Sequence, residues 1–216
     1  KRLLGDVSHE LRSPLARLRI ALALAEQDSD NRANHLRRID HEAERLEELI
    51  GQLLSSQTAQ TNLDLHIDLV ALLEELCSDT SFEGESIAKV VVFVSDLDEA
   101  LVATHGDLLK KTFENILRNA LKYTPPNSTV HTTLIQNGEY YTVRIEDQGP
   151  GVAESELDKL FEEFYREDTA RPRETGGYGL GLAIAKRAVA AHKGVISAEN
   201  TGAGLAIVVA IPAYVD

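Results

Sequence analysis

The sequence contains no methionine, no tryptophan and few aromatic residues (5%). No stretch approaches the run of ~18 apolar residues that a membrane-spanning helix needs, so no span is predicted within it. The pattern of a secretory signal peptide is also absent. The chain begins at Lys1, already inside a helical apolar pattern. We therefore expect it to be a fragment of a longer protein.

There is a single cysteine, Cys77, so an internal disulfide is excluded, which is typical of a reducing compartment. The residue lies in the apolar helical pattern of residues 72–77. We predict that it is a small buried hydrophobe and neither a ligand nor a nucleophile.

Positive charge is scarce in the second part of the chain. The formal net charge is −13, and residues 62–216 hold thirteen Lys and Arg against twenty-five Asp and Glu. A nucleic-acid surface needs a basic footprint, so a nucleic-acid partner is excluded. An acidic domain can still bind a phosphate ligand where its few cations are concentrated.

Residues 1–61 predict an all-α helical hairpin, because apolar residues recur every three or four positions in two segments. They are Leu4, Val7, Leu11, Leu15, Leu18 and Leu22 in the first segment, and Leu36, Ile39, Ala43, Leu46, Ile50 and Leu53 in the second. Residues 28–31 have turn and N-cap composition, and Pro14 predicts a bend because it removes a backbone hydrogen bond. Two helices leave one apolar stripe exposed, so we expect a homodimeric four-helix bundle through residues 1–61.

The first helix is predicted to present a reactive imidazole to solvent. His9 lies ~200° around the helix from the apolar Val7 and Leu11. Ser13 follows one turn later on the same face, and Glu10 flanks His9. A neutral imidazole is a good nucleophile, and a neighbouring carboxylate can hold the proton on one ring nitrogen so that the other can attack. The alternative is a surface histidine in an ordinary hairpin.

After a polar linker at residues 55–62, residues 62–216 predict an α+β sandwich with a mixed sheet under one layer of helices. Asp68 and Asp107 are expected to cap helices, and Asn137-Gly138 predicts a β-hairpin. The predicted strands are 63–67, 89–94, 100–104, 129–136, 140–146, 195–199 and 205–211, and the predicted helices are 68–84, 107–123, 154–160 and 180–192.

Three glycine clusters stand out in this domain: Asp147–Gly151, Gly176–Gly181 and Gly202–Gly204. None matches the phosphate loop or the dinucleotide fingerprint, and each by itself is typical of a turn. The second cluster leads directly into a helix, whose first N–H groups favour an anion.

The helix at 107–123 presents a polar face made by Asn115, Asn119 and Lys122, which are spaced i, i+4 and i+7. An uncharged amide oxygen suits Mg²⁺, and a lysine can meet phosphate as a point charge. The alternative for this helix alone is a solvated polar face.

Taken in order, these motifs resemble the conserved boxes of sensor histidine kinases. The segments that carry the resemblance are Ser8–Leu15, Glu114–Tyr123, Asp147–Gly151, Phe161–Arg166 and Gly177–Gly181. The resemblance covers the whole chain, and details of residues 164–177 resemble the envelope-stress branch of the family. It implies a dimerisation and histidine phosphotransfer hairpin at 1–61 and, at 62–216, the ATP-binding domain shared with gyrase B, MutL and the heat-shock ninety chaperones.

The resemblance also implies a role for individual residues. His9 would be the phosphoacceptor, Glu10 its general base and Ser13 the residue that orients water for dephosphorylation of a receiver domain. Asp147 would accept a hydrogen bond from the adenine amino group. The other implied contacts are Gly149 and Gly151 at the base, Asn119 and Asn115 at Mg²⁺, Lys122 and Tyr123 at the phosphates or sugar, one or more of Arg166, Arg171 and Arg173 at the phosphates, and Gly177, Gly179, Leu180 and Gly181 around the triphosphate.

Two residues depart from the family pattern. Tyr178 stands where a small residue is usual in the last glycine box, so packing of the lid formed by residues 161–178 is expected to differ. Asn115 stands where the related ATPases have a water-activating glutamate. Because an amide cannot take up a proton in this way, the substitution favours phosphoryl transfer over hydrolysis.

The implied function is autophosphorylation with ATP and Mg²⁺, followed by transfer to an aspartate of a response regulator. A phosphatase activity toward that regulator is expected as well. The implied location is the cytoplasmic domain of a bacterial inner-membrane protein, whose membrane segments would precede this chain. The alternatives are an ATPase or clamp of the gyrase and chaperone type and a pseudokinase scaffold.

Overall fold

The computed structural model describes residues 14–25, 31–39, 42–43, 46, 63, 65–162, 165 and 181–214. The chain forms two compact units, and each is considered by itself. The described residues up to 46 belong to the first unit, and those from 63 onward to the second. No helix in these described ranges is long and apolar enough to cross a bilayer.

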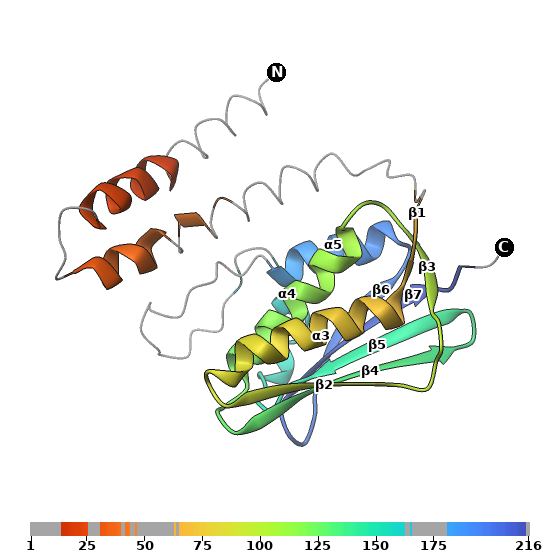
Figure 1. The fold of residues 1–216 in the computed structure, drawn as a ribbon. Helices are drawn as coiled ribbons and strands as arrows, with labels where there is room; N and C mark the ends of the chain where they lie inside the picture. Colours follow the sequence, from red (N-terminus) through yellow and green to blue (C-terminus); the bar gives the residue numbers. More distant parts are fainter. Residues whose placement is uncertain are drawn as a thin grey trace. The chain divides into compact units, whose positions relative to one another are not determined.

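In the first unit, residues 14–25 and 32–39 are helical, as predicted (Figure 1). The buried stripe of the first helix is formed by Pro14, Ala21 and Ala25. Leu15 and Leu22, which belong to the apolar repeat of this helix, are 45% and 48% exposed in the single chain. The predicted four-helix bundle needs a second copy of the hairpin, so leucines that are exposed in one copy do not contradict it. The bend predicted at Pro14 involves residues outside the described ranges.

The second unit is a two-layer α+β sandwich, in agreement with the sequence (Figure 1). Its main sheet has the order β2-β4-β5-β7-β6, and one face is covered by α3, α4 and α5. The strands are β2 Lys89–Ser95, β4 Ser128–Asn137, β5 Tyr140–Glu146, β6 Val195–Asn200 and β7 Leu205–Pro212. The helices are α3 Leu69–Glu85, α4 Leu108–Tyr123 and α5 Gly181–Ala191. Only the pair β2–β4 is parallel among the paired strands that the structure describes.

A second sheet of two antiparallel strands, β1 Leu65–Asp68 and β3 Leu101–Thr104, lies beside the first. The predicted cap at Asp68 is confirmed, because its Oδ1 accepts the N–H of Val70 at 3.0 Å. Asp107 occupies the N-cap position of α4, but its side chain makes no capping hydrogen bond. The helix there begins through the backbone alone, with the N–H of Lys111 donating to the carbonyl of Asp107 at 2.9 Å.

Two further predictions need correction. Asn137 pairs with Tyr140, so the hairpin turns through Gly138 and Glu139, one residue later than Asn137-Gly138 predicts. Gly138 has φ +60°, which suits a glycine at the first central position of a two-residue turn. The helix predicted at 154–160 is a pair of short 3₁₀ segments, η2 Glu154–Glu156 and η3 Asp158–Phe161.

The core lies between the three helices and the main sheet. Its largest fully buried side chains include Phe113 of α4, Leu73 of α3 and Leu134 of β4. Cys77 is buried in the same core, and burial raises the pKa of its thiol to about 11. The predicted burial of Cys77 among hydrophobic residues is therefore confirmed.

Candidate nucleotide site

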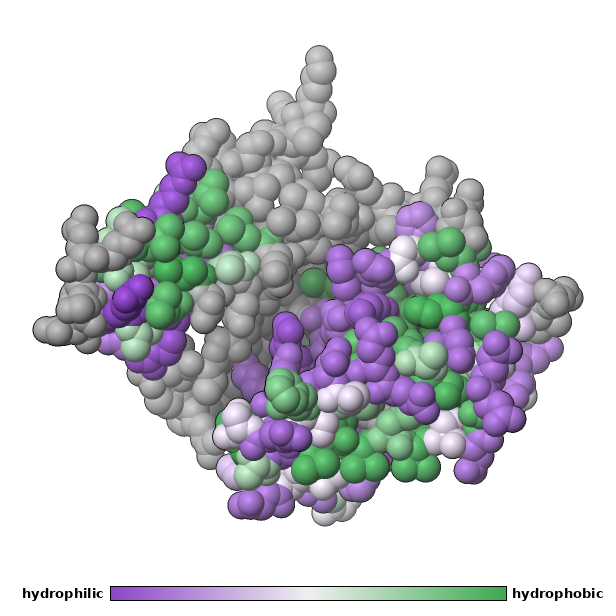
Figure 2. Space-filling view, in the orientation of Figure 1, coloured by the Kyte–Doolittle hydropathy of each residue, from purple (hydrophilic) through white to green (hydrophobic). Residues whose placement is uncertain are grey.

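The candidate site is formed by one face of α4, the loop after β5, the turn between β6 and β7, and the first residue of α5. On α4, the apolar residues Phe113, Ile116, Leu117, Ala120 and Leu121 are buried, which leaves Asn115, Asn119 and Lys122 on the opposite, half-buried face. This division is the one that the sequence predicts. Figure 2 shows that the exposed surface of the second unit in this view is largely hydrophilic, with smaller apolar areas.

Asp147 is a buried carboxylate at the end of β5, with 6% of its surface exposed. Its Oδ1 accepts the N–H of Gly149 at 2.7 Å and the N–H of Leu205 at 3.3 Å. Burial raises its pKa, the two N–H groups act in the opposite direction, and the nearby Glu146 adds to the rise. Both hydrogen bonds with described residues are made by Oδ1, so Oδ2 is available to accept a hydrogen bond from a ligand.

Glycines surround this carboxylate because no side chain fits there. A Cβ on Gly149 would lie 2.8 Å from Asp147 Oδ1 and 2.9 Å from the carbonyl oxygen of Tyr123. A Cβ on Gly204 would overlap the carbonyl of Asp147 and lie 2.8 Å from both Asp147 Oδ1 and the nitrogen of Gly149. Gly151 has φ +67°, a left-handed conformation that favours glycine. The backbone therefore approaches the carboxylate closely on two sides.

Gly204 was overlooked as a site residue from the sequence. The glycine cluster at 202–204 by itself indicates only a turn. The signal lies in the strand register: Glu146 pairs with Ala206, so the residue after β5 must lie beside the residues that precede Ala206. The N–H of Asp147 donates to the carbonyl of Leu205 at 2.9 Å, which extends this pairing by one step.

The polar face of α4 is half-buried at Asn115, Asn119 and Lys122. Neither Asn115 nor Asn119 makes a side-chain hydrogen bond to another residue in the described ranges. The ammonium of Lys122 lies 5.3 Å from the ring centroid of Tyr123, an exposed side chain. A Cβ on Gly181 would lie 3.7 Å from Asn115 Cβ, so the structure brings the start of α5 against this face.

Two other side chains, which no local sequence pattern singles out, hold the loop at Asp147. Thr124 follows α4 and accepts the N–H of Gln148 on its Oγ1 at 3.0 Å. Asn200, at the end of β6, accepts the N–H of Val152 on its Oδ1 at 3.0 Å. Their roles depend on contacts between segments that are distant in the sequence.

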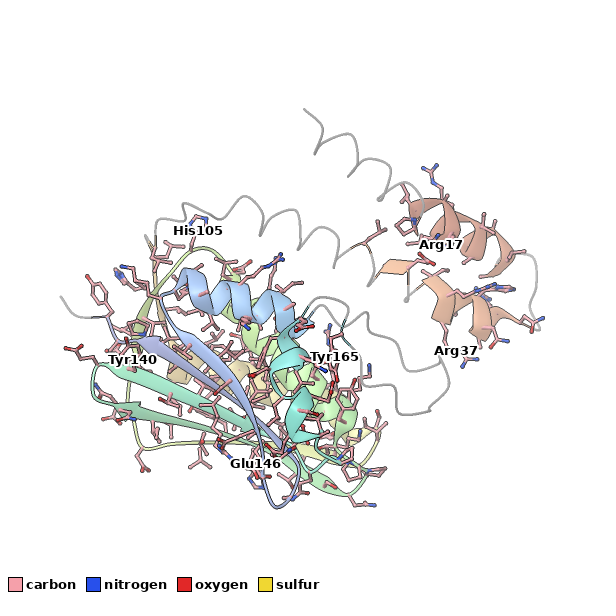
Figure 3. All side chains as sticks on the ribbon, turned by 180° about the vertical axis from the view of Figure 1, so that it is seen from behind. Arg17, Arg37, His105, Tyr140, Glu146 and Tyr165 are labelled. Atoms are coloured by element: carbon pink, nitrogen blue, oxygen red, sulfur yellow. The ribbon has the colours of Figure 1, made fainter. Side chains whose placement is uncertain are left out.

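The segment that enters the predicted lid is anchored on η2. The hydroxyl of Tyr165 donates to Glu156, and Lys159 Nζ lies 3.0 Å from Glu156 Oε1 (Figure 3). The hydrogen bond from Tyr165 and the contact with Lys159 lower the pKa of Glu156. Lys186 of α5 places its ammonium 5.5 Å from the ring centroid of Phe161.

Some predicted site residues lie outside the described ranges, and their roles remain predictions. They are His9, Glu10, Ser13, Arg166, Arg171, Arg173, Gly177, Gly179 and Leu180, together with the unusual Tyr178. The described part of the predicted nucleotide site consists of Asn115, Asn119, Lys122, Tyr123, Asp147, Gly149, Gly151 and Gly181.

Comparison with known proteins gives a consistent result. Residues 104–215 match the family described as histidine kinase-, DNA gyrase B-, and HSP90-like ATPase, and residues 1–62 match the His Kinase A (phospho-acceptor) domain. The sensor histidine kinase CpxA of Escherichia coli (strain K12) is 37% identical over 218 residues, which are 99% of this chain and 47% of CpxA. The resemblance to the envelope-stress kinase CpxA that residues 164–177 indicate is thereby confirmed.

A more distant relative is the sensor protein kinase WalK of Staphylococcus aureus, 33% identical over 229 residues, which cover 100% of this chain and 54% of WalK. The chain thus spans about half the length of these relatives. Full-length ShkA in complex with AMPPNP has the same fold, with a TM-score of 0.76 at 22% identity over 100% of this chain and 46% of ShkA. The chain belongs to the sensor histidine kinases, and its residues 104–215 belong to the domain family that these kinases share with DNA gyrase B and HSP90.

Proposed function

We propose that ATP bound at the candidate nucleotide site phosphorylates His9, and that the phosphoryl group then passes to an aspartate of a response-regulator receiver domain. In this proposal, residues 1–61 are the dimerisation and phosphotransfer hairpin and residues 62–216 the catalytic domain. The observation that carries it is the buried carboxylate of Asp147, bordered by the glycine backbone of a loop that contacts the last residue of α4.

At the adenine end, Oδ2 of Asp147 accepts a hydrogen bond from the exocyclic amino group. Its partner oxygen Oδ1 is already fixed by the N–H groups of Gly149 and Leu205, so the carboxylate is oriented before the base arrives. Such preorganisation reduces the entropy that binding would otherwise lose. The absence of side chains on Gly149 and Gly151 lets the base approach the backbone.

At the phosphate end, Asn119 and Asn115 offer amide oxygens that fit Mg²⁺, an ion that takes oxygen ligands and keeps water and phosphate in its shell. When bound, the ion would neutralise charge on the phosphates. Lys122 and Tyr123 meet the phosphates or the sugar. One or more of Arg166, Arg171 and Arg173 contact the phosphates, and the backbone of Gly177, Gly179, Leu180 and Gly181 surrounds the triphosphate.

At the acceptor, a ring nitrogen of His9 attacks the γ-phosphorus in line with the leaving oxygen, while Glu10 holds the proton on the other nitrogen. Positioning and charge neutralisation supply most of the catalysis in phosphoryl transfer. Asn115 supports transfer over hydrolysis, because its amide cannot accept a proton from an attacking water.

The proposed partners follow from the same organisation. The exposed Leu15, Leu22 and Leu36 leave apolar surface on the hairpin that a second copy can bury, which supports a homodimer. The receiver domain would dock near His9, and Ser13 would orient water when the kinase dephosphorylates it. We place this chain in the cytoplasm, as part of a bacterial inner-membrane protein whose membrane segments lie outside it.

Incubation of the chain with γ-labelled ATP and Mg²⁺ tests the proposal. We expect a label that is stable to alkali and labile to acid, absent from His9→Ala and retained by His35→Ala, a matched histidine change in the same hairpin. Sustained release of inorganic phosphate without protein labelling would instead identify an ATPase. Labelling of His9→Ala would show that another residue is the acceptor.

A second experiment separates the two activities. Ser13→Ala should autophosphorylate at the wild-type rate but remove phosphate from a phosphorylated regulator more slowly. Equal loss of both activities would contradict the separate role of Ser13.

A further inference from the structure

A buried hydroxyl joins the adenine end of the site to the helix that carries its phosphate end. Residues 147–152, here named the adenine loop, follow β5. The N–H of Gln148 in this loop donates to Oγ1 of Thr124 at 3.0 Å, and Thr124 is only 2% exposed. The loop also rests against α4 directly, because the carbonyl oxygen of Tyr123 lies 2.9 Å from where a Cβ on Gly149 would stand.

Thr124 is attached to the end of α4. It is the C-cap residue of that helix, and its own N–H donates to the carbonyl of Ala120 at 3.0 Å. Gln148 is also held on the far side, where its Oε1 accepts the N–H of Thr129 at 3.1 Å. The end of α4, about one turn beyond Asn119, therefore determines the position of the adenine loop.

A second polar side chain holds the other end of the loop but leads elsewhere. Asn200 accepts the N–H of Val152 on Oδ1, and its Nδ2 donates to the carbonyl of Val152 at 2.7 Å and to Glu154 Oε1 at 2.8 Å. Asn200 belongs to β6, so it fixes the loop to the sheet and makes none of these bonds with α4.

We propose that Thr124 is a positioning residue that sets the register between the adenine contact at Asp147 and the phosphate-binding face of α4. This inference rests on the proposed function. A nucleotide that is held at both ends gains affinity from the second contact only if the two ends are placed at the right separation. Adenosine contacts only the adenine end, so its affinity does not depend on the distance between the two ends. ADP contacts both ends, so its affinity does depend on that distance.

The test measures dissociation constants of ADP with Mg²⁺ and of adenosine for the full 216-residue chain and three variants. Thr124→Val removes one hydrogen bond at almost constant volume, and we expect ADP to bind about tenfold more weakly while adenosine changes by less than about twofold. Thr124→Ser keeps the hydroxyl and should restore the wild-type ratio of the ADP dissociation constant to the adenosine dissociation constant. Asn200→Ala, the control on the sheet side, should weaken both ligands by the same factor.

The outcomes are decisive in each direction. A parallel loss of ADP and adenosine affinity in Thr124→Val, or a serine variant that fails to recover, would overturn the register role. If Thr124→Val does not fold, Thr124→Ala removes the same hydroxyl with a smaller side chain and is judged by the same ratio. Failure of the wild-type chain to bind either ligand would instead refute the proposed function itself.

Discussion

Replacing Gly204 by alanine tests whether the close approach of backbone to Asp147 is necessary for nucleotide binding. The added methyl group would overlap the carbonyl oxygen of Asp147 and lie 2.8 Å from its Oδ1 and from the nitrogen of Gly149. None of these atoms belongs to a flexible side-chain end, because two are backbone atoms and the third is fixed by two N–H groups. The methyl group must therefore displace the adenine loop from the start of β7.

The magnitude can be worked out from these contacts. Forcing a methyl group into a filled space costs about 1 to 3 kcal/mol. The same displacement stretches the hydrogen bonds of Leu205 with Asp147, at 2.9 Å and 3.3 Å, each worth about 1 kcal/mol. If about 1.4 to 2.8 kcal/mol of this cost falls on the arrangement that binds the nucleotide, affinity for ADP drops about 10- to 100-fold.

Isothermal calorimetry with ADP gives the affinity, and urea denaturation gives the free energy of unfolding. Gly202→Ala is the matched control from the same turn, because a Cβ at Gly202 meets nothing within 4 Å. We expect Gly202→Ala to bind ADP like the wild type. Equal ADP affinity of the two alanine variants would refute the reasoning that Gly204 exists to admit the Asp147 backbone.

Three further outcomes are expected. Cys77, buried and with its pKa raised to about 11, should react with a thiol reagent at pH 8 only when urea unfolds the chain; fast labelling of the native chain would contradict its burial. Burial lowers the pKa of His192. Below pH 6.5 the unfolded chain therefore binds a proton at this residue more readily than the folded chain does. Stability should therefore be full above the ordinary pKa of 6.5 and fall as pH drops below it, and urea titrations of His192→Gln should lose part of this slope. Chelation of Mg²⁺ by EDTA should weaken ADP binding and leave adenosine binding unchanged, as equilibrium dialysis can show; an equal effect on both would argue against metal at the phosphate end.

The sequence predicts the elements of the second unit closely because their signals are local. Asp68 caps α3 with its own side chain, and the apolar spacing of α4 separates a buried face from the face of Asn115 and Asn119. Signals of this kind need only one helix or one turn to be recognised. The position of Asp147 also follows locally, since it ends a strand that the alternation of β5 already marks.

The features that the sequence missed are those that depend on packing between distant segments. Gly204 matters because β7 pairs with β5, Thr124 because α4 ends beside the adenine loop, and Asn200 because β6 ends beside Val152. In the hairpin, periodicity identifies an apolar surface but cannot say which residues meet within one copy. Among the described residues of the first helix, Ala21 and Ala25 are buried, whereas the larger Leu22 is exposed.

The layout of charge explains how so acidic a domain can bind a polyanion. Asp147 and its neighbour Glu146 lie at the end of the site proposed for adenine, where the ligand carries no charge. The face of α4 proposed for the phosphates presents neutral amides at Asn115 and Asn119, with Lys122 in the last turn of the helix. Carboxylates at 115 and 119 would attract Mg²⁺ more strongly, but without the metal they would repel the triphosphate. Amides avoid that repulsion and lack the basicity to activate water, so in the proposed site the same choice of residue would serve both nucleotide binding and transfer to histidine.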